Sequence, residues 1–80
     1  MSHTPHELHD EFPDAGGILH KLKVENAHFQ KLSDHYHDVN REIHRIESGV
    51  EASSDERAED LKKQRLLLLD EIGKMVREAA

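Results

Sequence analysis

Residues 46–56 read Ile-Glu-Ser-Gly-Val-Glu-Ala-Ser-Ser-Asp-Glu, and this stretch predicts a chain reversal between two helices. Gly49 is the residue type that most easily takes the left-handed backbone conformation at a helix C-terminus, and Val50 is placed to fold back on the last turn. Ser53, followed three residues later by Glu56, is the pattern of a capping box that begins the next helix. Because so short a link joins them, we expect the two helices to be antiparallel neighbours.

Upstream of the reversal, apolar residues alternate steps of three and four, which is typical of a helix that packs along another helix. We therefore predict a first long helix from about residue 14 to 48. Running the spacing backwards meets a break at Glu25, and Gly16-Gly17 should loosen the first turns. The residues expected in the seam are Phe29, Leu32, Tyr36, Val39, Ile43 and Ile46.

Downstream, the same spacing predicts a second helix from about residue 54 to 78. Arg65 takes the one polar core position, and we expect its stem to pack while its guanidinium emerges to meet Glu42 or Asp38. The predicted fold class is all-α: an antiparallel, coiled-coil-like hairpin of two helices in a single domain. The seam residues of the second helix are Leu61, Arg65, Leu68, Ile72 and Met75.

A short helix is predicted at about residues 5–12, ahead of the hairpin. Thr4 can cap it, Pro5 suits its first position and Glu7 completes a capping box. Leu8 and Phe12 form its apolar edge, which is too short to be stable unless it docks. Because the first long helix outruns the second, residues 14–24 should project beyond the hairpin unless this edge covers them.

The second helix also carries a second apolar stripe beside the first. A helix that is apolar over so wide an arc is normally buried on two sides. We therefore expect self-association, most simply a dimer that forms a four-helix bundle. The alternative is that two of the leucines rest under the N-terminal segment or stay half-exposed. The stripe is Leu66, Leu69, Gly73, Val76 and Ala80, and its first four residues are the expected interaction face.

The amino-acid composition argues against several classes of protein. The chain has 80 residues, no cysteine and a formal net charge of −6 with its histidines neutral. An acidic chain with interspersed charges is a poor nucleic-acid binder. Leu66–Leu69 is the longest apolar run, far short of a membrane span, and the first residues lack the plan of a secretory signal. We expect a cytoplasmic protein without a cofactor. A protein partner is possible, but the sequence does not identify it.

Eight histidines raise a metal hypothesis. His6, His9 and Asp10 could share one face of the short helix, and imidazole with carboxylate suits Zn²⁺ or Ni²⁺. The expectation is nevertheless that the chain has no resident metal. His28 and His35 flank the seam, which gives a second hypothesis: their protonation near pH 6.5 tunes self-association. The simpler interpretation is that they are solvated surface histidines.

Neither catalysis nor nucleic-acid binding is the leading interpretation. The adjacent acids Glu59-Asp60 lie on an exposed helix face, and two helices alone should not form a pocket suited to acid–base chemistry. We expect a non-catalytic interaction module. A nucleic-acid-associated regulator is the alternative, in which an oligomer concentrates the basic residues Arg41, Arg45, Lys62, Lys63 and Arg65.

Several segments together resemble the YdcH-like proteins, a family of small bacterial helical hairpins of unknown function. The resemblance covers about residues 8–76, and Gly16-Gly17 departs from the charged, helix-forming residues expected there. It implies a bacterial cytoplasmic setting and a helical hairpin, and it brings no catalytic residues to this chain. The segments are His9–Pro13, Asn26–Phe29, Arg41–Glu47, Leu61–Leu66 and Asp70–Ile72.

Overall fold

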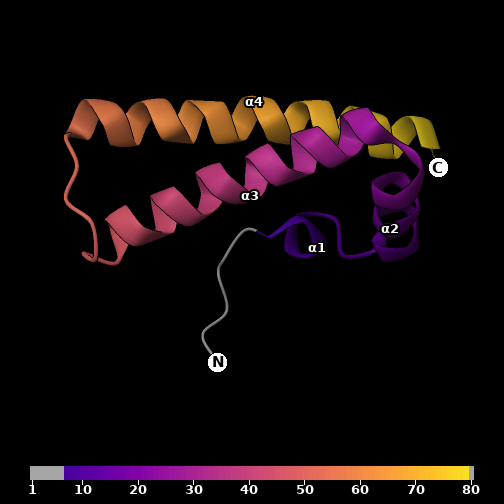
Figure 1. Cartoon of the computed structure of the whole chain (residues 1–80), viewed down its shortest axis with the longest axis horizontal. Coiled ribbons are helices and arrows are strands. Elements are labelled where there is room, and N and C mark those ends of the chain that lie inside the picture. Colours follow the sequence, from indigo (N-terminus) through magenta and orange to yellow (C-terminus); the bar gives the residue numbers. More distant parts are fainter. Residues whose placement is uncertain (1–6, 80) are drawn as a thin grey trace.

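The structure is a computed structural model that describes residues 7–79; the other residues, 1–6 and 80, are not discussed structurally. The described part is all-helical and contains no strand, which confirms the predicted all-α class. Its helices are α1 (Leu8–Glu11), α2 (Gly16–Glu25), α3 (Ala27–Glu47) and α4 (Asp55–Ala79). Figure 1 shows α3 and α4 as two long rods, with α2 across one end of them and α1 below.

The two long helices lie side by side and run in opposite directions (Figure 1). Helix α4 begins and ends within one residue of the predicted bounds. Most residues expected in the seam are buried, and Tyr36 and Ile72 are completely so. The buried seam residues are Phe29, Tyr36, Val39, Ile43, Leu61, Leu68 and Ile72, and the partly buried ones are Leu32, Ile46, Arg65 and Met75.

The reversal between α3 and α4 turns at Gly49, whose φ is +81°. Gly49 N–H donates to the Ile46 carbonyl at 3.2 Å, and Val50 N–H donates to the Arg45 carbonyl at 3.0 Å. These bonds satisfy carbonyls that the helix end would otherwise leave without partners. Val50 itself is 78% exposed, so the expected contact of its side chain with the last turn is absent.

The cap of α4 differs by one residue from the predicted capping box. Ser54, not Ser53, accepts a hydrogen bond through its Oγ from the Arg57 N–H at 3.2 Å. Ser53 Oγ instead donates to the carbonyl of Ser54. Adjacent serines offer two equivalent caps, and the chain uses the one that starts the helix at Asp55.

The predicted helix of residues 14–48 is divided at Asn26, which is the main correction to the sequence-based architecture. Asn26 has an extended backbone (φ −125°, ψ 107°), and its side chain accepts a hydrogen bond from the Phe29 N–H at 3.0 Å. Its own N–H closes α2 on the Leu22 carbonyl at 2.8 Å. Asparagine therefore ends one helix and caps the next, a role for which its short side chain is well suited.

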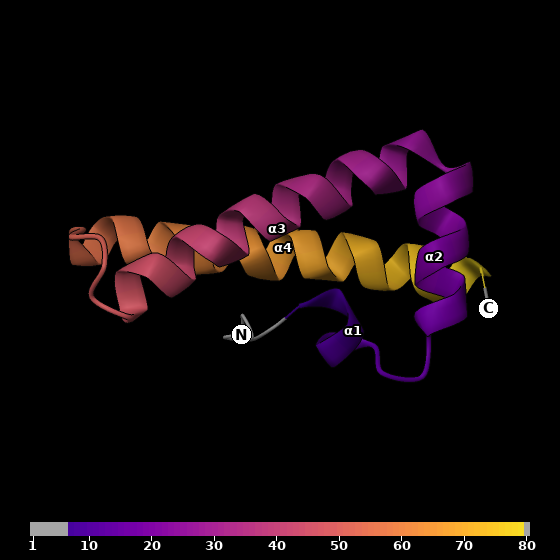
Figure 2. The ribbon, with the colours of Figure 1, turned by 60° about the horizontal axis from the view of Figure 1, so that its bottom comes forward.

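Because the chain bends at Asn26, residues 16–25 do not project past the long helices. Helix α2 instead folds across their end and contacts both α3 and α4 (Figure 2). Its Ile18, Leu19 and Leu22 pack against the core, but none of its residues is fully buried. The start of α2 is weakly specified, since its cap residue Ala15 makes no side-chain hydrogen bond there.

The short N-terminal helix docks on the long helices, as its apolar edge requires. Leu8 is only 6% exposed, and Phe12 packs on Gly73 of α4, with its Cζ 3.4 Å from the position that a Cβ at Gly73 would take. The observed cap is Glu7, whose N–H donates to the Asp10 carboxylate at 3.3 Å. The predicted cap, Thr4 with Pro5, lies outside the described residues.

Within residues 7–79, we find no helix that combines the length and the apolar character needed to cross a bilayer.

Replacing Asn26 by alanine should lower the free energy of unfolding by about 1 kcal/mol, because the first turn of α3 loses its side-chain cap. Urea denaturation followed by circular dichroism measures this difference. Asp34→Ala is the control, since Asp34 is an exposed residue within α3 and caps nothing. An Asn26→Ala protein as stable as the control would show that the bend does not depend on the cap.

Candidate functional site

The expected interaction face of α4 is divided by the N-terminal segment. Leu66 is 60% exposed, and Leu69 is partly buried. Gly73 lies under Phe12, and Val76 is buried in the core. Val76 is therefore not available to a partner, which corrects that part of the prediction. Gly73 is reached only through a groove beside Phe12, because the bend at Asn26 brings α1 and Phe12 onto this flank. What remains open is the stretch of α4 around Leu66.

A groove of about 280 Å³ lies beside the uncovered stretch, between the end of α1 and the C-terminal half of α4. Phe12, Leu69 and Gly73 supply its apolar part. Glu11, Asp70 and Arg77 surround them with charges of both signs. Leu66 does not line the groove, but it lies one helical turn before Leu69 and Asp70, which do. The flank of α4 that contains Leu66 and this side of the groove is called the Leu66 strip below.

Leu67 is as exposed as Leu66, at 66%, but it lies about 100° around the helix, on another flank. Leu67 therefore cannot share one flat contact with Leu66. Two further exposed apolar residues, Val24 on α2 and Val50 in the reversal, stand at opposite ends of the long helices and adjoin neither leucine.

Two polar residues of α3, Ser33 and Asn40, are buried to within 2% exposure, although the heptad pattern does not predict them. Each follows a seam residue by four positions, so they form a row beside Phe29 and Tyr36. Arg65 Nη1 donates to Asn40 Oδ1 at 3.1 Å. Arg65 thus meets a neutral amide, and the expected partner Glu42 is paired instead with Arg57.

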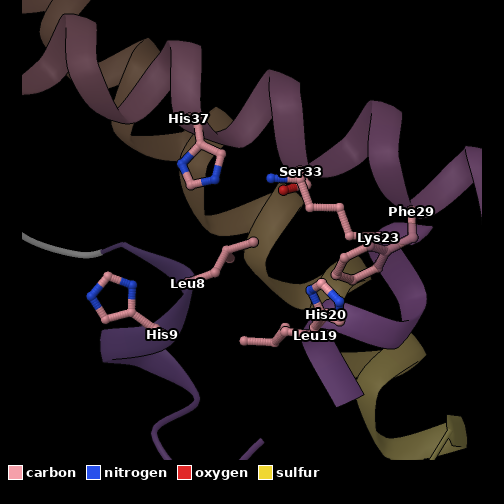
Figure 3. Close-up of a pocket in the computed structure, with 8 residues that line it drawn as sticks. All are labelled: Leu8, His9, Leu19, His20, Lys23, Phe29, Ser33 and His37. Carbon is pink, nitrogen blue, oxygen red and sulfur yellow. The ribbon is translucent and has the colours of Figure 1, made fainter. Parts of the chain in front are cut away.

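A second pocket, of about 160 Å³, lies where α1, α2 and α3 meet (Figure 3). Histidines from all three helices line it: His9, His20 and His37. His37 is held on the molecule: its Nδ1 lies 2.9 Å from Glu7 Oε2, and its ring meets the ring of Tyr36 edge-on. His28 and His35, the residues expected to flank a partner surface, are exposed.

The candidate metal ligands are only partly described. His6 lies outside the described residues. His9 Nε2 is 3.5 Å from Asp10 Oδ1, and Asp10 also accepts the capping hydrogen bond of Glu7. Among residues 7–79, no three histidine or acidic side chains are grouped so that they could hold one metal ion.

Most of the basic residues proposed for nucleic-acid contact lie against partners in their own chain. Arg41 is 3.7 Å from Asp38, Arg45 is 3.3 Å from Glu51, and Lys62 is 3.8 Å from Glu47. Arg65 is directed to Asn40, as described above. Of this set, only Lys63 extends from α4 as an exposed residue for which we describe no partner.

A family model described as "Protein of unknown function (DUF465)" matches residues 29–76 of the chain, which is more than half of it. The chain belongs to the DUF465 family. This confirms the resemblance to the YdcH-like proteins. The match covers most of α3 and most of α4, whereas α1 and α2 lie outside it. Neither the comparison with curated proteins nor the comparison with solved structures found a match.

In this DUF465 chain, Arg65→Leu should lower the free energy of unfolding by about 1–3 kcal/mol, because buried Asn40 loses a hydrogen-bond donor. Urea denaturation of Arg65→Leu, Asn40→Leu and the double variant forms a double-mutant cycle. Additive losses would contradict a direct interaction, whereas we expect the double variant to recover part of the loss.

Tyr36 makes this DUF465 chain sensitive to alkali. Burial raises the pKa of Tyr36 to about 12, Glu11 adds to the rise and Arg65 partly offsets it. The free chain has the ordinary value of 10.0, so the folded state is favoured below pH 10 and loses this advantage as the pH rises towards 12. The free energy of unfolding should fall by about 2–3 kcal/mol over this pH range.

Because the chain has one tyrosine and no tryptophan, tyrosinate absorbance reports this residue alone. We expect it to appear near pH 12, or together with unfolding if the helices melt first. Tyr36→Phe is the control for stability: its unfolding free energy should fall less between pH 10 and 12. Ionisation near pH 10 with the circular dichroism unchanged would contradict the burial of Tyr36.

Proposed function

We propose that this chain is a non-catalytic helical interaction module whose α3 and α4 form an antiparallel hairpin that self-associates. The simplest assembly is a dimer with four long helices, in which the α4 helices of two copies cross at Leu66. The proposal rests on one observation: the strip of α4 centred on Leu66 is complementary to itself in both spacing and charge.

The apolar centre of this strip supplies the driving force. Leu66 is 60% exposed in the single chain, and burying a leucine fully contributes about 1.5–3 kcal/mol. A contact with a second copy buries two such side chains at once, one from each chain. The groove beside Phe12 and Leu69 extends the apolar area, because the first turns of the second copy's α4 would lie over it.

The charges of the strip set the direction of packing. Around Leu66, the residues on this flank follow steps of four and three that read the same in both directions: Asp55, Glu59, Lys62, Leu66, Asp70, Gly73 and Arg77. A two-fold axis at Leu66 pairs residues equidistant from it, as an interface between identical patches requires. Lys62 then meets Asp70 of the second copy, and Asp55 meets its Arg77.

Both pairs join opposite charges, and the axis generates each pair twice. Exposed ion pairs contribute only about 0.2–1 kcal/mol each, so they choose the orientation while Leu66 supplies the affinity. A parallel arrangement of the same helices would place like charges together along the strip, which is unfavourable. In the single chain Lys62 lies 3.8 Å from Glu47, an exposed contact that it can share with Asp70 of a second copy.

The proposed setting is the cytoplasm of a bacterial cell. The absence of cysteine from the sequence is compatible with a reducing compartment, and the YdcH-like resemblance points to bacteria. A protein partner that docks on the flank of Leu67 would be a further role of the same module.

The test measures molecular mass in solution at micromolar concentration for the natural chain, Leu66→Glu and Leu67→Glu. We expect a dimer for the natural chain and for Leu67→Glu, and a monomer for Leu66→Glu, because only Leu66 lies on the proposed axis. The two variants are matched, since both replace an exposed leucine of α4 by the same acid. A monomeric natural chain would overturn self-association, and loss of the dimer only in Leu67→Glu would move the interface to the other flank.

Charge exchange tests the orientation. Lys62→Glu should weaken the dimer, because it places two acids opposite each other on both sides of the axis. Lys62→Glu combined with Asp70→Lys should restore the dimer, because the exchanged charges attract again. A double variant no stronger than Lys62→Glu alone would show that these two residues do not meet across a two-fold axis.

A further inference from the structure

The pocket between α1, α2 and α3 has an unusual polar lining for so acidic a chain. Of 17 aspartate and glutamate residues in the sequence, none lines it. Its polar side chains are instead the ammonium of Lys23 and the hydroxyl of Ser33, which can donate hydrogen bonds, and three imidazoles, each of which can donate from one ring nitrogen and accept at the other. Figure 3 shows Lys23 extending from α2 towards Ser33 on α3.

Two carboxylates that do not line the pocket lie against imidazoles that do. Glu7 pairs with His37, and Asp10 pairs with His9. When a neutral imidazole donates its N–H to a carboxylate, its other ring nitrogen is an acceptor, so the charged donor of the lining is Lys23. Lys23, in contrast, is exposed on α2, and no ion pair of its ammonium is among those we describe. The lining thus favours a bound group that is negatively charged.

The rest of the lining is hydrocarbon. Leu8 from α1, Leu19 from α2 and the buried ring of Phe29 from α3 form it. A ligand with a short hydrocarbon chain would add to the apolar contacts of these side chains, which an inorganic anion could not do. A negatively charged head group would supply an acceptor for Lys23 and Ser33, which a neutral hydrocarbon could not do. The pocket measures about 160 Å³. Sites for drug-sized ligands are roughly 300–1,000 Å³, so only a small molecule fits.

We propose that this pocket binds a small organic acid, whose carboxylate meets Lys23 and Ser33 and whose short hydrocarbon chain rests on Leu8, Leu19 and Phe29. The ligand would bridge three helices, two of which lie outside the part of the chain that the family model matches. Binding would therefore stabilise the N-terminal segment in its docked position, because a ligand favours the state that holds its site together.

Nuclear magnetic resonance titrations of the full chain test this inference. The probes are acetate, propionate and butyrate, with inorganic phosphate and chloride at matched ionic strength. We expect saturable shifts of the amides of α1, α2 and the first half of α3. Each added methylene should tighten binding about fourfold, the value that hydrocarbon burial predicts. Phosphate and chloride should produce no saturable shifts at these amides.

Two lysine variants complete the test. Lys23→Gln should weaken butyrate binding about tenfold or more, because it removes the charged donor. Lys31→Gln is the matched control: Lys31 is exposed on α3, does not line the pocket, and should leave the affinity unchanged. Circular dichroism checks that both variants fold.

Three outcomes would overturn the inference. The first is the absence of saturable shifts with butyrate. The second is equal affinity for acetate, butyrate and phosphate, which would indicate an adventitious ion only. The third is unchanged binding by Lys23→Gln. Because none of these measurements depends on Leu66, failure here leaves the proposed self-association to its own test.

Discussion

The bend at Asn26 is the constraint on which the rest of this structure depends. Two helices that meet along one seam each leave a flank uncovered, and the bend places the N-terminal segment over the flank of α4. A chain of 80 residues buries only a modest fraction of its surface, so the α3–α4 seam alone makes a thin core. The bend turns α2 across the end of the seam and returns α1 to its side. Leu8 and Phe12 then add a third layer, which the two long helices could not supply themselves.

Much of this fold could be predicted from sequence, because it rests on local and periodic signals. The three-four spacing identifies the seam, and Gly49 marks the reversal. The bend could not be predicted in the same way. Residues on both sides of Asn26 favour a helix, and the choice between a helix interior and a cap depends on whether the chain can turn onto something apolar. The gap in the pattern at Glu25 was the only local signal, and it was equally compatible with a continuous helix.

In the candidate site, too, some features could be predicted from the sequence and others depended on contacts between distant residues. Leu66 is exposed as the periodicity suggested, but the coverage of Gly73 and Val76 required knowing where Phe12 would dock. A glycine within a helix costs stability and often has a packing reason, so Gly73 was a usable signal of close approach. Asn40 had no comparable signal. Its side chain accepts a hydrogen bond from Arg65, which comes from a distant part of the sequence.

The weak start of α2 has a consequence for the way the molecule opens. This helix has no fully buried residue, begins with two glycines and lacks a side-chain cap, whereas α3 and α4 share the seam. Proteins open locally in units of unequal stability, and the least buried unit exchanges its amide protons first. We therefore expect residues 7–25 to open as the outer unit of the chain, detaching and reattaching many times during one lifetime of the helix pair beneath them.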